Sequence, residues 1–462
     1  GQVMVFSSSV FLLLFLPLVV LIYYNPFCKG RKFRNNFLLG ASLFFYAWGE
    51  PFFVILMILS IVVGWFTGKK IDEAPQNKKK RILIVGASFH IGLLFIFKYL
   101  TFTARQLGLL LNKDFSWLNI ALPIGISFFT FQLLSYLFDI YYGKAKAQKS
   151  ILNVGLYIAL FPQLIAGPIV RYDTIEDQIM NRRESMNDFC SGMQRFIYGL
   201  AKKVLIANYV AQVADNIFDS GTTLSVATAW LGAVAYTLQI YFDFSGYSDM
   251  AIGLGRMFGF KFPENFNYPY ISKSAAEFWH RWHISLGSWF KDYVYIPLGG
   301  SKVSTGRWIF NMFVVWSLTG LWHGANWTFL FWGLFYFVLL LAERFTRFPK
   351  RIGYWAYVYS FFVIIIGRTI FRSPDIQSFL HYLGMMFGVG SAGITDYMFN
   401  YYISGSYVVM AAGILFCFPV IRKLREIKMF NAMEPVLSVM LFLLTLINVI
   451  SSSYNPFIYF NF

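Results

Sequence analysis

Long apolar runs recur along the whole chain, and short basic segments separate them. The runs lie near residues 10–25, 36–49, 51–67, 82–103, 120–142, 151–168, 195–217, 224–242, 308–321, 326–342, 354–372, 404–421 and 433–452. Charged residues make up only 13% of the 462 positions, about half of what the surface of a soluble domain needs. A membrane-spanning helix needs about 20 apolar residues. The sequence therefore predicts an all-α integral membrane protein.

The basic segments predict how the chain is oriented. They lie at 29–34, 69–81, 144–149, 344–351 and 422–428. Lys and Arg collect in cytoplasmic loops, so we assign these segments to the cytoplasmic side. Some apolar runs are short enough to be half-spans or surface helices, which leaves about eleven crossings with both termini outside. The run at 10–24 has no basic segment before it, so we expect a retained span rather than a signal peptide.

The net charge of +17 bears on possible partners. In a soluble protein it would suggest nucleic acid, but here the cytoplasmic loops account for it, and we expect no nucleic-acid partner. A basic cytoplasmic rim would also attract an anionic donor, such as a coenzyme A thioester or an acidic carrier protein. The three cysteines, at positions 28, 190 and 417, have no spacing typical of disulfides or metal sites.

We expect one polytopic domain over residues 1–462, since no soluble insertion interrupts the apolar runs. It comprises N-terminal spans at 1–150, a core at 151–345 and C-terminal spans at 346–462. Residues 261–307 break the rhythm with mixed aromatic and charged residues. This composition is too polar for lipid and too aromatic for a free loop, so we expect a re-entrant segment packed against other helices.

His323 is the first candidate for chemistry, because it lies between two apolar runs in the segment Gly320 to Trp327. The run before it, 308–321, is short for a crossing at 1.5 Å per residue, which would place His323 at membrane depth. An ionisable group there is costly and suggests function. The alternative is a histidine packed on tryptophan and bonded to a helix backbone.

His283 is the second candidate, and it follows His280 at a spacing that places both on one face of a helix. The pair could ligate a metal, but no carboxylate or thiolate completes a ligand set, so we predict no metal site. A proton relay or donor-binding role for His283 is the better interpretation. His280 could simply face the membrane interface.

A polar cluster at 243–249 follows an apolar run directly. Two acids and hydroxyl groups at the end of a span need partners, water or substrate, or they cap the next helix. We expect substrate contacts from this cluster and from the neighbours of the two histidines. These residues are Trp322, Asn326, Trp282, Arg281, Ser285, Asp243, Ser245, Ser248 and Asp249. From these residues alone, acyl transfer by an imidazole base and a transporter's proton relay both remain open.

Several longer motifs resemble the membrane-bound O-acyltransferase (MBOAT) superfamily. They lie at 242–253, 262–266, 281–286, 295–300 and 322–324, and the segments 161–168 and 456–460 are similar to its bacterial branch. The resemblance implies an MBOAT-like bundle of about eleven transmembrane helices with re-entrant and surface helices. It also implies that His323 matches the catalytic histidine and His283 the second key histidine.

The resemblance further implies a bacterial cytoplasmic membrane enzyme with no permanently bound cofactor. Its donor would be acetyl-coenzyme A, or the thioester of an acyl carrier protein, entering from the cytoplasm. Its product would be an O-acetylated extracytoplasmic polysaccharide or peptidoglycan, made with an extracytoplasmic acetyltransferase partner or directly on the glycan. D-alanyl transfer to teichoic acid is the enzymatic alternative, and a non-catalytic transporter is the other. The aromatic tail, 454–462, could dock a partner or form a membrane-interface belt.

Overall fold

The computed structural model describes residues 3–461, and in this range every regular element is a helix. One isolated antiparallel bridge, between Phe266 and Trp282, is the closest approach to sheet structure there. The all-α prediction is confirmed. The chain divides into two compact units, and their boundaries fall inside the helices α10 and α12, between residues 263 and 264, and after residue 458. The three consecutive parts expected from the sequence do not follow these boundaries and stay a prediction.

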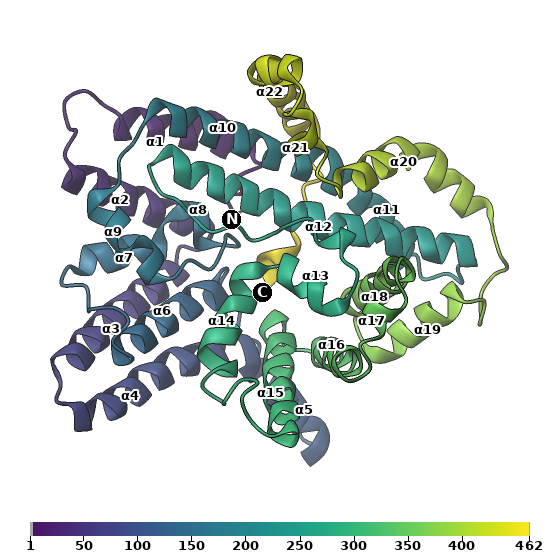
Figure 1. Ribbon diagram of the computed structural model, residues 1–462, viewed down its shortest axis with the longest axis horizontal. Coiled ribbons are helices and arrows are strands. Elements are labelled where there is room, and N and C mark those ends of the chain that lie inside the picture. The colour runs from purple at the N-terminus through teal and green to yellow at the C-terminus, as the bar shows by residue number, and fades with distance from the viewer. Residues whose placement is uncertain (1–2, 462) are drawn as a thin grey trace. The chain divides into compact units, whose positions relative to one another are not determined.

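Unit 1 comprises residues 1–196, 250–263 and 459–462 (Figure 1). Its elements are η1 (Phe11–Phe15), α1 (Leu16–Tyr23), α2 (Arg31–Gly49), α3 (Phe53–Glu73), α4 (Gln76–Leu94), η2 (Phe95–Tyr99), α5 (Leu100–Leu111), α6 (Ile126–Tyr141), α7 (Ile151–Ala159), α8 (Phe161–Leu164), α9 (Tyr172–Asn181) and most of α10 (Met186–Ala201). The elements η1 and η2 are π-helical turns that continue into α1 and α5.

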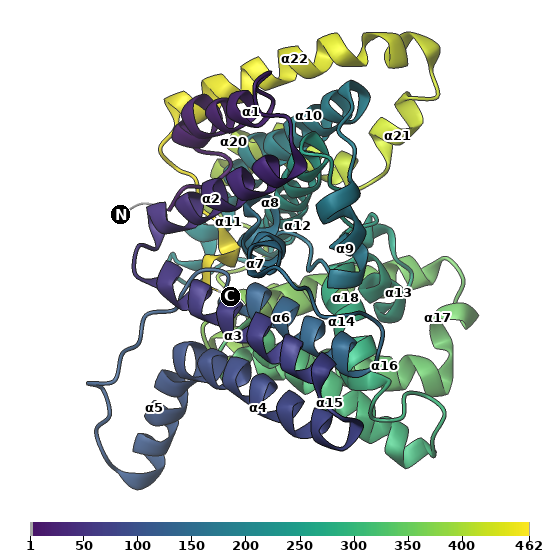
Figure 2. The same ribbon diagram turned by 90° about the vertical axis from the view of Figure 1, so that its left-hand side faces the viewer.

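Helices α3, α4 and α6 lie side by side in unit 1, as Figures 1 and 2 show. Glycines bring their backbones together. A Cβ atom on Gly86 of α4 would lie 2.3 Å from the Thr67 side chain of α3, and one on Gly64 would lie 2.5 Å from Leu133 of α6. Small residues at helix contacts are how membrane helices gain packing energy, because lipid supplies no hydrophobic drive between them.

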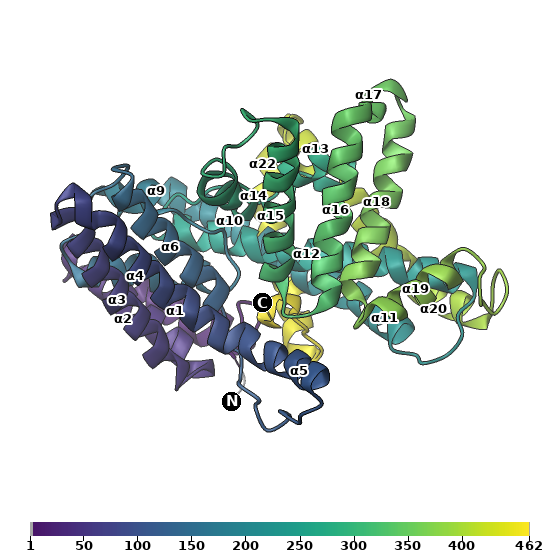
Figure 3. The same ribbon diagram turned by 90° about the horizontal axis from the view of Figure 1, so that it is seen from below.

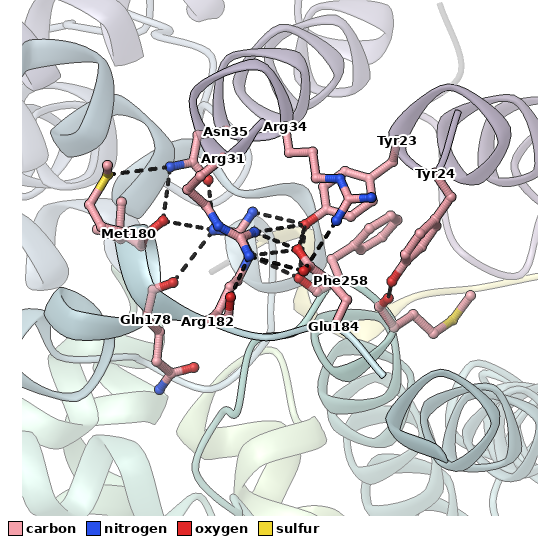
Figure 4. A network of polar contacts seen from close by, with 12 residues as sticks. Tyr23, Tyr24, Arg31, Arg34, Asn35, Gln178, Met180, Arg182, Glu184 and Phe258 are labelled. Atoms are coloured by element: carbon pink, nitrogen blue, oxygen red, sulfur yellow. Dashed lines mark hydrogen bonds and ion pairs between the residues drawn. The ribbon is translucent and has the colours of Figure 1, made fainter. Parts of the chain in front are cut away.

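An ion network around Glu184 joins three segments of unit 1 (Figure 4). The Glu184 carboxylate accepts from both terminal nitrogens of Arg31, at 2.5 and 2.9 Å, and from the Tyr23 hydroxyl at 2.5 Å. Arg34 lies 3.2 Å away, and Arg182 completes the ring at 3.7 Å. One carboxylate thus holds three guanidinium groups together at the N-terminal end of α2.

Acid should weaken this network in a defined pH window. Burial raises the pKa of Glu184, but hydrogen bonds from Arg31 and Tyr23 outweigh it and lower this pKa from 4.5 to about 2. The carboxylate therefore contributes its stability above about pH 4.5 and loses it as the pH falls toward 2. Glu184→Gln should lower the free energy of unfolding by about 2 kcal/mol at pH 7, because the hydrogen bonds to a charged group are lost.

The measurement is thermal unfolding of the detergent-purified protein between pH 7 and 3. The stability gap between the wild type and Glu184→Gln should close as the pH falls. The exposed acid Glu176 of α9 provides the control, because Glu176→Gln should leave the melting temperature unchanged. A gap of constant size across this range would show that the ion network does not carry the effect.

Unit 2 comprises residues 197–249 and 264–458. Its elements are the end of α10, η3 (Lys202–Ala207), α11 (Asn208–Phe218), most of α12 (Val226–Met257), η4 (Pro269–Ile271), α13 (Ala275–Arg281), α14 (Ile284–Phe290), η5 (Lys291–Tyr295), α15 (Thr305–His323), α16 (Trp327–Thr346), α17 (Phe348–Arg351), α18 (Trp355–Arg372), α19 (Ile376–Met386), α20 (Tyr397–Phe416), α21 (Val420–Leu424), α22 (Lys428–Ser451) and the first residue of η6 (Ile458–Asn461).

Helices α15, α16 and α18 pack in sequence in unit 2 (Figure 3). The crossing of α15 and α16 is backbone against backbone. A Cβ atom on Gly320 would lie 2.3 Å from the Phe329 carbonyl oxygen, and one on Gly333 would lie 2.3 Å from that of Trp316. Only glycine fits at these positions, and the close crossing brings the end of α15 against the side chains of α16.

The membrane assignment is supported by six helices of the described chain that are long and apolar enough to cross a bilayer. They are Phe53–Glu73, Gln76–Leu111, Trp327–Thr346, Trp355–Arg372, Tyr397–Phe416 and Lys428–Ser451. Two shorter apolar helices, Phe11–Tyr23 and Ile126–Tyr141, accompany them. The protein is a multi-pass membrane protein. The count of eleven crossings and the orientation of the termini stay predictions.

Two helices are longer than their apolar runs suggested. The run at 308–321 belongs to α15, which begins at Thr305 and has 19 residues, because Ser304 caps it with a hydrogen bond from the Arg307 amide. The run at 224–242 belongs to α12. This helix has 32 residues in all and continues through the polar cluster. The region 261–307 is broken into the short elements η4, α13, α14 and η5, and the re-entrant path expected for it stays a prediction.

Candidate active site

His323 is the last residue of α15, and its side chain is 2% exposed. The chain leaves the helix through Gly324 in an extended conformation, and α16 begins three residues later behind the capping residue Asn326. The His323 ring packs edge-on against Trp332 of α16, with the ring centres 4.9 Å apart, and against Phe371 of α18 at 5.4 Å. Three helices therefore fix its position.

His283 lies between α13 and α14 and is 1% exposed. Its φ angle is +47°, in the left-handed region, which histidine tolerates better than most side chains. Helix α13 ends at Arg281, so His280 and His283 do not share one continuous helix. His280 is exposed. The i,i+3 spacing that suggested a metal pair therefore does not bring the two rings together.

Asn265 holds the turn that carries His283. Its backbone carbonyl accepts from the Ile284 amide at 3.0 Å, and its side-chain oxygen accepts from the amide and the hydroxyl of Ser285 at 3.1 and 2.8 Å. Its side-chain nitrogen donates to Ser248 of α12 at 3.2 Å. The first amides of a helix need such partners. Asn265 thereby supplies, from a distant segment, the cap that α14 lacks locally.

The two histidines come together in unit 2. Their ring centres are 6.4 Å apart, and Trp322 packs beside both rings, 5.6 Å from His283 and 5.1 Å from His323. Phe244 of α12 packs edge-on against His283 at 4.6 Å. Of the chain's other histidines, His280 and His381 are exposed, and His90 lies in unit 1. Geometry thus selects the pair that the sequence singled out.

Arg368 supports the pair from α18 and was not predicted. Its guanidinium carbon lies 4.0 Å from the centre of the Trp282 ring, and its Nε donates to the Tyr270 hydroxyl at 3.4 Å. The residue is 1% exposed. Stacking on an aromatic ring stabilises a guanidinium group away from water. Because Trp282 immediately precedes His283, Arg368 helps to set the backbone of the turn. A charge in the apolar run at 354–372 was the available signal.

The polar cluster of α12 is built into an ion-pair network. Asp243 pairs with Lys203 at 2.9 Å, and both side chains are almost fully buried. Lys203 also donates to Asn208 at 2.9 Å and to the Pro456 carbonyl, while the Ile458 amide donates to Asp243 at 3.0 Å. The tail at 454–458 is therefore bound to unit 2. Residue 462 lies outside the described chain.

Breaking the buried ion pair should lower the free energy of unfolding much more than breaking the neighbouring, partly exposed ion pair. Lys203→Met leaves the Asp243 carboxylate buried without its cation, and we expect a loss of about 3–5 kcal/mol. Lys202 pairs with Asp249 at 2.6 Å but is 29% exposed, so Lys202→Met should cost about 1 kcal/mol or less. Thermal unfolding in detergent compares the two. Equal losses would contradict a structural role for the buried pair.

Some of the remaining predicted residues lie beside the histidine pair, and others are partly exposed or cap a helix. Trp322 and Trp282 are buried beside the histidines, and Ser245 is buried one residue after Phe244. Asn326 accepts from the Thr328 amide at 3.1 Å and donates to the Pro374 carbonyl at 2.9 Å, as a helix cap does. Arg281 pairs with Glu277 at 3.3 Å and is partly exposed. Substrate contact by these residues stays a prediction.

A buried imidazole pair flanked by aromatic rings suits proton transfer to or from a substrate hydroxyl. Within residues 3–461, no group of three His, Cys, Asp or Glu side chains is placed to hold a metal ion. Comparisons with known proteins identify the family. The family model for "MBOAT, membrane-bound O-acyltransferase family" matches residues 145–371, a range that contains both histidines.

Full-length relatives extend this match. The chain is 43% identical to a probable alginate O-acetylase of Pseudomonas aeruginosa, over 85% of the chain and 76% of the relative. The chain belongs to the membrane-bound O-acyltransferase family. It is also 35% identical to a peptidoglycan O-acetyltransferase of Helicobacter pylori, over 85% of the chain and 81% of that protein. A teichoic acid D-alanyltransferase of Bacillus subtilis is 29% identical over 49% of the chain and 60% of its own length.

Membership in this family confirms the resemblance seen in the motifs and makes the protein an O-acyltransferase. The positions that the resemblance assigned to chemistry, His283 and His323, are the two that the fold buries together. Sequence reasoning missed the supports of the candidate site, namely Asn265, Arg368, Phe371 and Trp332. Each comes from a different element than the histidine that it contacts or supports.

Proposed function

We propose that the protein transfers an acyl group, specifically acetyl, from a thioester donor on the cytoplasmic side to hydroxyl groups of an extracytoplasmic polysaccharide or peptidoglycan. The observation that carries this proposal is the buried pair of His283 and His323 in a chain of this family, 6.4 Å between ring centres. The names of the alginate and peptidoglycan relatives, which cover most of the chain, supply the acceptor class.

The proposed reaction needs one base and no metal. A ring nitrogen of His323 takes the proton from the acceptor hydroxyl while the hydroxyl oxygen attacks the thioester carbonyl carbon. The carbon–sulfur bond then breaks, the new ester forms, and the imidazolium returns the proton to the thiolate that leaves. His283 aligns the donor or relays a proton from the cytoplasmic side. Both termini would lie outside the bacterial cytoplasmic membrane.

D-alanyl transfer is the second candidate, favoured by the relative from Bacillus subtilis that matches half of the chain. Its donor is a thioester on a small carrier protein, whereas acetyl transfer uses acetyl-coenzyme A. Two assays on the purified protein separate them. Acetyl-coenzyme A turnover with no capture of an acyl carrier protein supports the proposal. Capture of the carrier without acetyl-coenzyme A turnover would favour D-alanyl transfer.

Transport without chemistry is the remaining alternative from the sequence. An extracytoplasmic acetyltransferase could act as the partner that receives the acyl group, or the glycan could receive it directly. Liposomes that contain the protein distinguish transport from transfer. We expect an acetyl ester to form on an acceptor outside when acetyl-coenzyme A is supplied on the cytoplasmic face. Substrate flux without any acyl product would contradict the proposal.

A further inference from the structure

An aromatic cage borders His323 through the ring of Trp332. Its rings are Trp279 of α13, Trp316 of α15, and Trp332 and Tyr336 of α16. Trp279 packs against Trp316 at 5.0 Å, Trp332 at 5.3 Å and Tyr336 at 5.1 Å between ring centres. Trp332 and Tyr336 are 5.4 Å apart. The elements that carry the rings can be followed in Figure 3.

Three polar hydrogens of this cage have no acceptor in the described part of the chain. They belong to the indole nitrogens of Trp279 and Trp332 and to the Tyr336 hydroxyl, and all three atoms are buried. Two other ring donors of unit 2 have backbone acceptors. The Trp230 nitrogen donates to the Met386 carbonyl at 2.8 Å, and the Tyr382 hydroxyl donates to that of Ala229 at 2.7 Å. Buried donors without partners are costly and mark places where something else binds.

The chemistry of the cage defines what fits there. Indole N–H groups donate and do not accept, so the ligand must bring acceptors. A sugar hydroxyl brings its own hydrogen, which the two indoles cannot accept and only the Tyr336 hydroxyl could. A carbonyl oxygen brings acceptors alone. The apolar ring faces also favour a neutral chain over a charged group.

We propose that Trp279, Trp332 and Tyr336 bind the thioester carbonyl oxygen and the neighbouring amide carbonyl oxygens of the acyl donor, beside His323. Trp332 links the two parts, because its ring contacts both His323 at 4.9 Å and Tyr336. This inference rests on the proposed function, since it assigns the donor's place in the same site. It divides the site into a donor side at α13 and α16 and leaves the acceptor hydroxyl to approach the imidazole from elsewhere.

A matched pair of tyrosine variants tests the inference on the purified, full-length protein with acetyl-coenzyme A as the probe. Tyr336→Phe removes a hydroxyl without a protein acceptor, so the melting temperature should hold or rise. The same variant should lower kcat/KM for acetyl-coenzyme A about tenfold, the effect of one lost hydrogen bond. Tyr382→Phe removes the hydrogen bond that this hydroxyl donates to the Ala229 carbonyl, so it should lower the melting temperature and leave kcat/KM unchanged. Trp332→Phe should also lower kcat/KM, but its smaller ring leaves a cavity against His323 and Tyr336, so its melting temperature should fall.

Three outcomes would overturn the inference. In the first, Tyr336→Phe lowers the melting temperature as Tyr382→Phe does and leaves kcat/KM unchanged, as expected if the hydroxyl only binds an internal water. In the second, the variants change only the KM for the acceptor glycan, which would place the sugar in the cage. In the third, the wild-type protein consumes no acetyl-coenzyme A, and then the proposed function fails first and this inference with it.

Discussion

Replacing His323 with alanine is expected to lower acyl transfer by about 10²- to 10⁴-fold, the range for loss of a general base. The physical reason is that no other imidazole of unit 2 lies where the His323 ring contacts Trp332 and Phe371. His283, whose ring centre is 6.4 Å away, is held by a different set of contacts and cannot take that position. The measurement is acetyl transfer by equal amounts of purified protein.

Two controls separate catalysis from folding. His323→Gln keeps a side chain of similar bulk against Trp332 and Phe371, so it should retain the wild-type melting temperature while transfer is lost. The exposed His280 of α13 provides the matched histidine, and His280→Ala should transfer at the wild-type rate. Wild-type acetylation by His323→Ala, in protein that folds normally, would remove His323 from the catalytic role.

Replacing His283 is expected to lower transfer by about 10²-fold, and the choice of substitute decides how the result is understood. His283→Ala removes the imidazole. It also places alanine, whose side chain cannot form a stabilising hydrogen bond, in the left-handed region, where φ is +47°. His283→Asn removes the imidazole but keeps a residue that tolerates this conformation. Both variants should therefore lose transfer, and His283→Asn should fold as the wild type does.

Asn265 gives an independent check on the same turn. Asn265→Ala leaves the His283 imidazole in place but removes the side-chain oxygen that accepts from the amide and hydroxyl of Ser285. If His283 acts through its position, Asn265→Ala should lower kcat more than it raises the KM for the donor. Unchanged turnover in His283→Asn would instead show that the imidazole is not needed, and that the turn alone matters.

The fold class could be predicted because the constraint acts on every residue. Lipid excludes charge wherever a helix crosses it, so runs such as 354–372 and 433–452 show in composition alone. Helix ends were harder to predict, because caps rather than apolar residues set them. Ser304 starts α15 before the apolar run begins, and α12 continues through Asp243 because Lys203 neutralises that carboxylate.

The motifs pointed to the two histidines and to the tryptophans beside them, whereas the residues that hold the pair in place could not be predicted. A histidine between apolar runs is visible as a local anomaly, and the motifs around His283 and His323 resemble a known family. The contacts that hold the pair link segments far apart in the chain. Asn265 reaches Ser248 and Ser285, and Arg368 reaches Trp282 across 86 positions of the sequence. No local pattern encodes such pairings.

The most direct test asks whether the two histidines form one site. The measurement is the rate of acetyl transfer from acetyl-coenzyme A by purified His283→Asn, His323→Gln and the double variant, beside the wild type. Residues that serve one reaction as a unit are strongly non-additive. The double variant should therefore lose no more activity than His323→Gln alone. Losses that multiply in the double variant, or single variants that transfer at the wild-type rate, would contradict an acyl-transfer site built from His283 and His323.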